Sequence, residues 1–164
     1  MLVIRALGMS MLMNKDFLAG FICGEGCFTF LKNYPVFSLT LGVDDMELLF
    51  NIKKFVGFGN IGLQKLKGDY KSCCFRVSGV SKCLRLAKIL EGNMQGVKSE
   101  QFLKWNEGIL FLKSKKVFGK KDFVYINSLK PAANKRAVNN KEVERIFSFF
   151  SESICCPYNL YDKY

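Results

Sequence analysis

The apolar positions of the chain change their spacing several times, and each change predicts a new element. Residues 15–25 fit an amphipathic helix with Asp16 near its start. In "CFTFLK", Phe28 and Phe30 lie on one side and Thr29 on the other, the period-two pattern of a half-buried strand. "NYP" predicts a turn, and "VFSLTLGV" continues as a second strand, antiparallel to the first.

A second helix and hairpin follow. In "DDMELLFNIKKF", Asp44 is predicted as the N-cap with Glu47 three residues later. The apolar stripe of this helix is predicted to be Leu48, Leu49, Ile52 and Phe55. "GFGNIGLQ" leads into a third strand, "KLKGDYK" forms a basic hairpin tip, and "SCCFRVS" returns as the fourth strand.

Helical patterns predominate in the rest of the chain, over about residues 81–90, 99–112 and 140–150. The order predicts an α+β fold: αββαββα with an antiparallel four-stranded sheet and extra C-terminal helices. At 164 residues the chain is long enough for one domain, which we assign to 15–164 after an N-terminal extension, 1–14, of open role.

Small hydrogen-bonding side chains occupy the strand positions opposite the apolar ones. An antiparallel sheet can bury one face on helices and present the other to a partner. Such side chains can hydrogen-bond base edges, and lysines at the rims can bind phosphates, although a solvated sheet face explains the same pattern. The face would carry Thr29, Ser38, Thr40, Asn60, Gln64, Ser72 and Arg76, with Lys32, Lys65, Lys67 and Lys71 at its rims.

The charge of the chain favours a polyanionic partner. There are 25 Lys and Arg against 14 Asp and Glu, a formal net charge of +11, while 49% of residues are hydrophobic. This is the composition of a folded basic protein, although charge alone does not separate DNA, RNA and an anionic membrane surface. We expect no membrane partner, because no apolar stretch reaches the length of about 20 residues that a spanning helix needs.

Cysteine and histidine usage limits the chemistry. The seven cysteines include no CxxC pair, and the chain has no histidine, so a structural zinc site is not expected. An odd number of cysteines in apolar surroundings indicates free thiols in a reducing, intracellular compartment. Without histidine, catalysis must depend on a carboxylate, lysine, tyrosine or a metal ion.

The stretch "FLAGFICGEGC" holds one acidic residue, Glu25, in an otherwise apolar, glycine-containing run. "LAGFICGEG" resembles the signature of the LAGLIDADG homing endonuclease family, most closely the Gly-Glu-Gly variants of organellar intron-encoded members. The resemblance continues in order over roughly residues 15–140. It includes "PVFSLTLGVDDMELLFNIKKFVGFGNI", "FRVSGVSKCLRLAKIL", "KSEQFLKWNEGI" and "LKPAANKR".

The resemblance implies a metal-dependent nuclease centre. Glu25, with Gly24, would bind Mg²⁺, for which Mn²⁺ or Ca²⁺ can substitute in binding. Asp45 matches a position that orients solvent, and Lys98 matches a lysine that stabilises developing charge. Cys23 departs from the Asp that members usually carry. Lys135 and Arg136 would contact backbone phosphates.

The resemblance also implies the assembly. Gly20 and Gly24 lie four apart on one helical face and would allow two signature helices to pack closely at a dimer centre. Because one such motif is present, we expect a homodimer that cuts a long, near-palindromic double-stranded DNA target by phosphodiester hydrolysis, in a mitochondrion or another organelle.

Two alternatives remain open at this stage. An RNA maturase would assist intron splicing through divalent-independent RNA affinity on a basic surface away from the sheet. A catalytically inactive DNA-binding protein on the same fold would not need Glu25.

Overall fold

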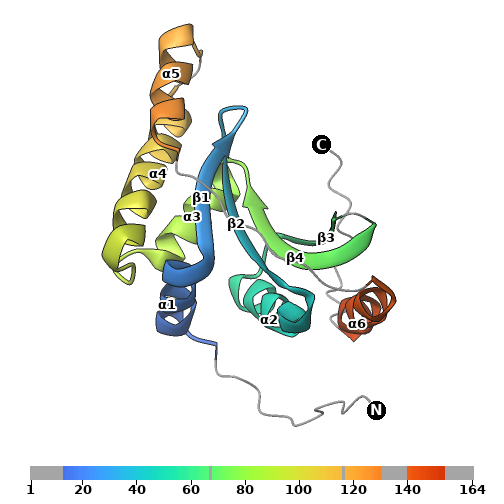
Figure 1. The fold of residues 1–164 in the computed structure, drawn as a ribbon. Coiled ribbons are helices and arrows are strands. Elements are labelled where there is room, and N and C mark those ends of the chain that lie inside the picture. Colours follow the sequence, from blue (N-terminus) through green and yellow to red (C-terminus); the bar gives the residue numbers. More distant parts are fainter. Residues whose placement is uncertain (1–12, 67, 116, 131–139, 154–164) are drawn as a thin grey trace.

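The computed structural model describes residues 13–66, 68–115, 117–130 and 140–153. Within them a four-stranded sheet is flanked by six α-helices (Figure 1). The elements are α1 (Lys15–Glu25), β1 (Gly26–Leu31), β2 (Tyr34–Gly42), the 3₁₀ turn η1 (Val43–Asp45), α2 (Met46–Val56), β3 (Asn60–Leu66), β4 (Asp69–Ser78), α3 (Val80–Leu90), α4 (Gly96–Ser114), α5 (Lys120–Ser128) and α6 (Asn140–Ser153). The predicted αββαββα order and the extra C-terminal helices are confirmed.

All strand pairs of the sheet are antiparallel, as predicted, in the order β1-β2-β4-β3. Helices cover one face, where Phe28, Phe37 and Phe75 are at most 1% exposed. The turn between β1 and β2 differs from the predicted "NYP". It consists of Lys32 and Asn33, whose φ angles of 46° and 67° are left-handed, as tight hairpin turns require.

Helix α1 begins where Asn14 accepts a hydrogen bond from the Phe17 backbone N–H at 2.8 Å. Met13, just before it, packs against the core. Both residues fall in the extension predicted over 1–14, whose residues 1–12 lie outside the described part. The buried side of the helix is Leu18, Ala19 and Ile22.

Helix α2 begins one residue later than predicted. Asp44 is not its N-cap: η1 precedes the helix, and Asp45 occupies the cap position without a side-chain capping bond. Its buried stripe is also rotated from the predicted one, because the helix packs on the core through Met46 and Phe50. The buried residues are Met46, Leu49, Phe50, Ile52 and Val56, while the predicted Phe55 is 37% exposed.

Helices α4 and α5 stand beside β1, and α6 lies beside α2 (Figure 1). The sequence reading did not predict α5, which is joined to α4 by a Lys115–Asp122 ion pair at 2.6 Å and a hydrogen bond from Tyr125 to Glu107. Trp105 of α4 is 1% exposed and contacts the Phe28 ring at 4.9 Å. Helix α4 therefore packs on the buried side of β1 and completes the core.

The described cysteines are free thiols, as predicted. Burial raises the pKa of Cys73 and of Cys83 to about 12, so both remain protonated at neutral pH. No helix of the described residues is long and apolar enough to span a bilayer.

Candidate functional site

Glu25 is the last residue of α1 and is exposed. The chain turns there into β1 through Gly26, which has extended backbone angles and donates its N–H to the Ile22 carbonyl. A Cβ at Gly26 would lie 2.6 Å from Ile22 Cγ2 and 2.7 Å from Ile22 O. The missing side chain thus lets β1 begin directly against the last turn of α1, which holds the Glu25 carboxylate at the junction.

Lys98 is brought to the same junction from α4. Its Nζ donates a hydrogen bond of 2.5 Å to the carbonyl oxygen of Gly26, the residue after Glu25. Farther along β1, Trp105 Nε1 donates to Thr29 O at 3.2 Å. These two bonds tie α4 to β1 and bring Lys98 to the residue that follows Glu25. A role for Lys98 in catalysis stays a prediction.

Asp45 makes no described contact with Glu25 or Lys98. It is exposed at the start of α2, three residues beyond the end of β2 at Gly42. Within the described ranges it forms no hydrogen bond or ion pair with Glu25 or Lys98. Its role in orienting solvent stays a prediction.

The donor set suits a hard divalent cation that takes most of its ligands from water or substrate. No group of three or more His, Cys, Asp or Glu side chains converges within the described part of the chain. Glu25 and Gly24 are both exposed, so their oxygens are accessible. Mg²⁺ is commonly bound by one or two carboxylates, with water and substrate phosphate completing its octahedron. A solitary exposed carboxylate fits that mode and does not fit a closed protein cage.

The predicted polar residues lie on one face of the sheet. The register places Ser38, Arg76 and Asn60 side by side across three strands. Farther along, Thr40 pairs with Cys74 and Gln64 with Ser72, whose hydroxyl donates to Gln64 Oε1 at 3.0 Å. Thr29 joins the face from β1. The strand alternation used in the sequence analysis therefore predicted this face correctly.

The same face includes residues that the sequence reading did not select. Cys27 pairs with Ser38, and Ser78 lies two residues beyond Arg76 on β4. A shallow groove runs over the β3–β4 side of this face, lined by Asn60, Ile61, Gly62, Leu63, Gln64, Cys74, Arg76 and Ser78. Strand alternation places Cys27 and Ser78 on this face by the same rule that places Thr29 and Arg76 there.

The rim lysines occupy different positions. Lys32 is exposed in the β1–β2 turn. A β-bulge between Gln64 and Lys65 moves Lys65 opposite Tyr70, with its Nζ 4.3 Å from the ring centroid. Lys71 is the extra residue of β4 at this bulge, and its Nζ is 3.8 Å from Asp69 Oδ2. Lys67, Lys135 and Arg136 lie outside the described residues.

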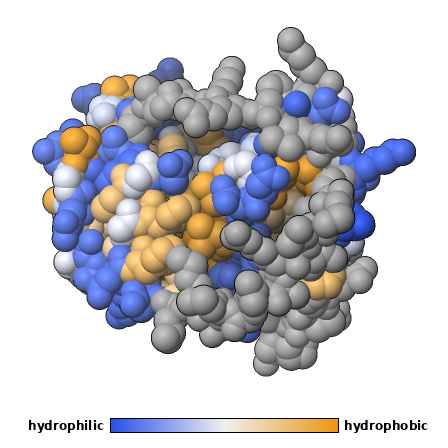
Figure 2. Space-filling view, turned by 60° about the horizontal axis from the view of Figure 1, so that its bottom comes forward, coloured by the Kyte–Doolittle hydropathy of each residue, from blue (hydrophilic) through white to orange (hydrophobic). Residues whose placement is uncertain are grey.

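One side of α1 is open. Gly20 and Gly24 are exposed, and a Cβ built at either would meet no atom within 4 Å. The Phe17 and Phe21 rings stack beside them, 6.0 Å between centroids. Viewed from the side of α1 and α2, the described surface shows apolar residues gathered between hydrophilic margins (Figure 2).

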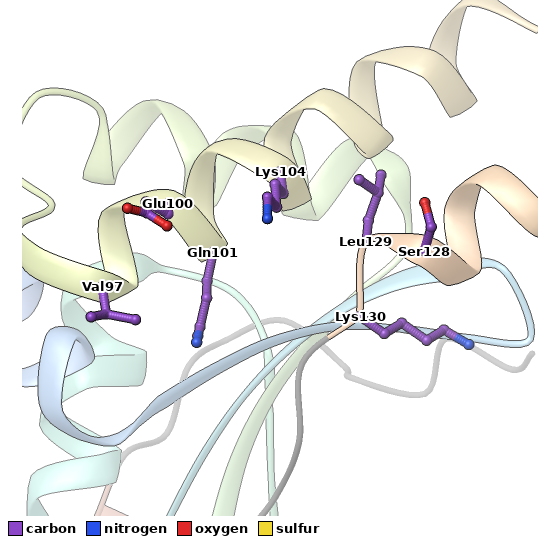
Figure 3. Close-up of a pocket in the computed structure, with 7 residues that line it drawn as sticks. All are labelled: Val97, Glu100, Gln101, Lys104, Ser128, Leu129 and Lys130. Atoms are coloured by element: carbon purple, nitrogen blue, oxygen red, sulfur yellow. The ribbon is translucent and has the colours of Figure 1, made fainter.

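A separate pocket lies between α4 and the end of α5. One stripe of α4, Val97, Glu100, Gln101 and Lys104, lines it together with Ser128, Leu129 and Lys130 (Figure 3). Gln101 Oε1 is buried there without a hydrogen-bond partner. None of the predicted catalytic residues lines this pocket, so the Glu25–Lys98 junction and not the pocket is the candidate catalytic centre.

The fold and the junction define a class of protein: a helix-backed antiparallel sheet with one carboxylate at the end of its first helix. The family model described as LAGLIDADG endonuclease matches residues 18–109. This chain belongs to the LAGLIDADG endonuclease family.

Individual proteins agree with that membership. A Neurospora crassa protein named "Probable intron-encoded endonuclease 4" is 33% identical over 93 residues. The match takes in 56% of this chain but only 17% of that relative.

Among solved structures, the LAGLIDADG meganuclease I-AabMI bound to uncleaved DNA is 26% identical, with a TM-score of 0.64 over 84% of this chain and 50% of that chain. The homing endonuclease I-TnaI has a TM-score of 0.63 at 18% identity over 84% of this chain and 98% of that chain. The latter likeness shows the fold alone.

Proposed function

We propose that the protein is a site-specific DNA endonuclease that acts as a homodimer and hydrolyses phosphodiester bonds with a divalent metal, preferably Mg²⁺. The observation that carries the proposal is the junction of α1 and β1. There an exposed carboxylate, Glu25, lies one residue from the carbonyl that Lys98 binds. The row of Cys27, Ser38, Arg76 and Asn60 on the open sheet face begins two residues after Glu25.

The sheet face supports DNA as the partner. Its side chains are amides, hydroxyls and a guanidinium, which can pair with base edges in the major groove. Arg76 is exposed in the central row, where it can make a paired contact with guanine. Lys32 and Lys65 lie at the ends of the face, where a duplex backbone would pass. A net charge of +11 adds attraction that does not depend on sequence.

The open side of α1 supports a homodimer. Two signature helices can approach closely where Gly20 and Gly24 carry no side chain. The chain also spans only half of the DNA-bound I-AabMI chain, so two copies of this protein would match that chain in length. In such a dimer the two Glu25 residues would lie near the axis, one for each DNA strand.

In this proposal each residue at or near the junction has a role in phosphodiester hydrolysis. Glu25 and the adjoining Gly24 would hold the cation, which when bound activates water and offsets charge on the scissile phosphate. The Lys98 ammonium, held by Gly26 O, would stabilise negative charge developing on the phosphate oxygens. Asp45 would accept a hydrogen bond from the attacking water.

A cleavage assay tests the proposal. The substrate is DNA spanning the uninterrupted insertion site of the host intron, incubated with Mg²⁺ or with chelator. We expect double-strand cleavage only with Mg²⁺, and binding that weakens with salt by a log–log slope of about −0.9 per neutralised phosphate. Metal-independent RNA binding without DNA cleavage would contradict the proposal and favour the maturase alternative. An organellar origin, in keeping with the intron-encoded relative, is part of the same proposal.

A further inference from the structure

Two contacts join α1 to α4, one on each side of Glu25. Before it, Cys23 Sγ accepts a hydrogen bond from the Gln95 backbone N–H at 3.4 Å and lies 3.6 Å from Gln95 O, to which its S–H donates. After it, Lys98 binds Gly26 O. The start of α4 is therefore attached to the end of α1 at two points that bracket the exposed carboxylate.

The Gln95 backbone N–H lies at the start of α4 and has no partner within the helix. Gln95 is the N-cap residue of α4, in an extended conformation, and its side chain makes no capping bond. The first N–H groups of a helix have no partner within the helix, and the N–H of the N-cap residue, here Gln95, likewise needs an acceptor from elsewhere. The Cys23 thiol, half-buried on α1, supplies that acceptor and also donates to the Gln95 carbonyl, which accepts the Ser99 N–H at 3.3 Å as well.

Only a side chain that both donates and accepts can make this pair of contacts. Ser has that capacity, although with a shorter reach, while Ala has neither function. An ionised Asp, the residue that the family resemblance leads us to expect at this position, accepts only and would face the Gln95 carbonyl with a second oxygen. The Cys23 thiol can therefore bind both the N–H and the carbonyl of Gln95, which a carboxylate at this position cannot do.

We propose that Cys23 is a positioning residue: its bridge to the Gln95 backbone sets where α4 begins and so fixes the offset of Lys98 from Glu25. Lys98 lies three residues after Gln95, one helical turn along, so a shift at the start of α4 moves its ammonium from the junction. The inference rests on the proposed nuclease function. It concerns the cleavage step and not DNA affinity, because the bridge lies off the polar sheet face.

The test is a double-mutant cycle on single-turnover cleavage. We expect Cys23→Ala to slow cleavage at least tenfold while the Kd for DNA changes less than twofold, and Cys23→Ser to restore most of the rate. In a Lys98→Ala background the same Cys23→Ala change should have almost no further effect, because Cys23 acts through Lys98. An equal slowing in both backgrounds, or a loss of rate that follows a loss of DNA affinity, would overturn the proposal.

Amide hydrogen exchange at Gln95 provides a readout independent of cleavage and applies even to a variant of lower stability. The Gln95 N–H should be protected in the wild type and in Cys23→Ser, and should exchange at least tenfold faster in Cys23→Ala relative to amides in the core of the sheet. Unchanged protection in Cys23→Ala would overturn the bridge itself. Normal exchange behaviour in a wild type that cuts no DNA would instead overturn the nuclease function and the role of Cys23 in cleavage with it.

Discussion

Replacing Gly26 with alanine should disturb both the stability of the domain and the catalytic junction. The backbone angles at this position, φ −71° and ψ 145°, suit alanine, so the obstacle is space. The added Cβ would lie 2.6 Å from Ile22 Cγ2, 2.7 Å from Ile22 O and 3.1 Å from the Phe37 ring. Ile22 and Phe37 are 0% exposed, so neither can move into solvent.

The size of the effect follows from this crowding. Forcing an extra methyl into a packed interior costs about 1–3 kcal/mol. Alanine also restricts the unfolded chain, which offsets about 0.4–1 kcal/mol. We expect a net loss of about 1–2 kcal/mol, which for a domain of this size lowers Tm by about 2–8 °C. The cleavage rate should also fall, by more than the loss of folded protein explains. Relief of the crowding moves Gly26, and with it the carbonyl that Lys98 binds, relative to the Glu25 carboxylate.

Thermal unfolding followed by circular dichroism measures the first effect, with Gly62→Ala as the matched control. Gly62 lies on β3, and a Cβ there meets no atom within 4 Å. Its replacement should leave Tm unchanged or slightly higher, because Gly is unfavourable within a strand. A Gly26→Ala protein with the wild-type Tm and wild-type cleavage would refute the role assigned to this close contact.

Three further predictions concern other regions. Arg76→Ala should cost about 1–3 kcal/mol of DNA binding and relax preference at one symmetric pair of base positions, and a uniform loss over all sequences in a binding selection would instead identify a phosphate contact. The hydrogen bond from Lys115 lowers the pKa of Asp122, so the ion pair stabilises the fold above the ordinary carboxyl range and stops doing so as pH falls below about 4. The difference in unfolding free energy between wild type and Asp122→Asn should therefore shrink to nothing in denaturation experiments at decreasing pH. A difference that does not change with pH would contradict the ion pair. Cys23 and Cys27 should react with a thiol reagent before Cys73 and Cys83, whose pKa is about 12, and peptide mapping that finds the buried pair modified first would contradict the core described here.

Features that depend on the spacing of apolar residues within one strand or helix could be predicted from the sequence. Phe28 and Phe30 alternate with polar residues, so the face of β1 that is buried could be predicted from spacing alone. The same rule placed Arg76 on the open face. Helix α5 was missed because its "KKDFVYINS" sequence has one buried residue, Ile126, and depends on contacts with α4 such as the ion pair of Lys115 with Asp122.

Features that depend on contacts between distant segments could not be predicted from spacing. Cys23 contacts Gln95 and Lys98 contacts Gly26, pairs separated by 72 residues. Resemblance to the family indicated Lys98, but no sequence pattern indicated the bridge at Cys23. The β-bulge at this end of the sheet likewise was not predicted: Gln64 pairs with Ser72 and Lys65 with Tyr70, so Lys71 is an extra residue in β4 that simple alternation does not anticipate.

The central claim is that each protomer contributes one catalytic Glu25, for one DNA strand. Its most direct test uses a mixed dimer of wild-type and Glu25→Gln chains, purified through two different affinity tags and mixed with a plasmid carrying the target and Mg²⁺. We predict nicked plasmid from the mixed dimer, linear plasmid from the wild type, and intact but bound plasmid from the Glu25→Gln homodimer, with Glu47→Gln as an exposed-carboxylate control that behaves as wild type. Linear plasmid from the Glu25→Gln homodimer, or double-strand cutting by the mixed dimer at the wild-type rate, would contradict the claim.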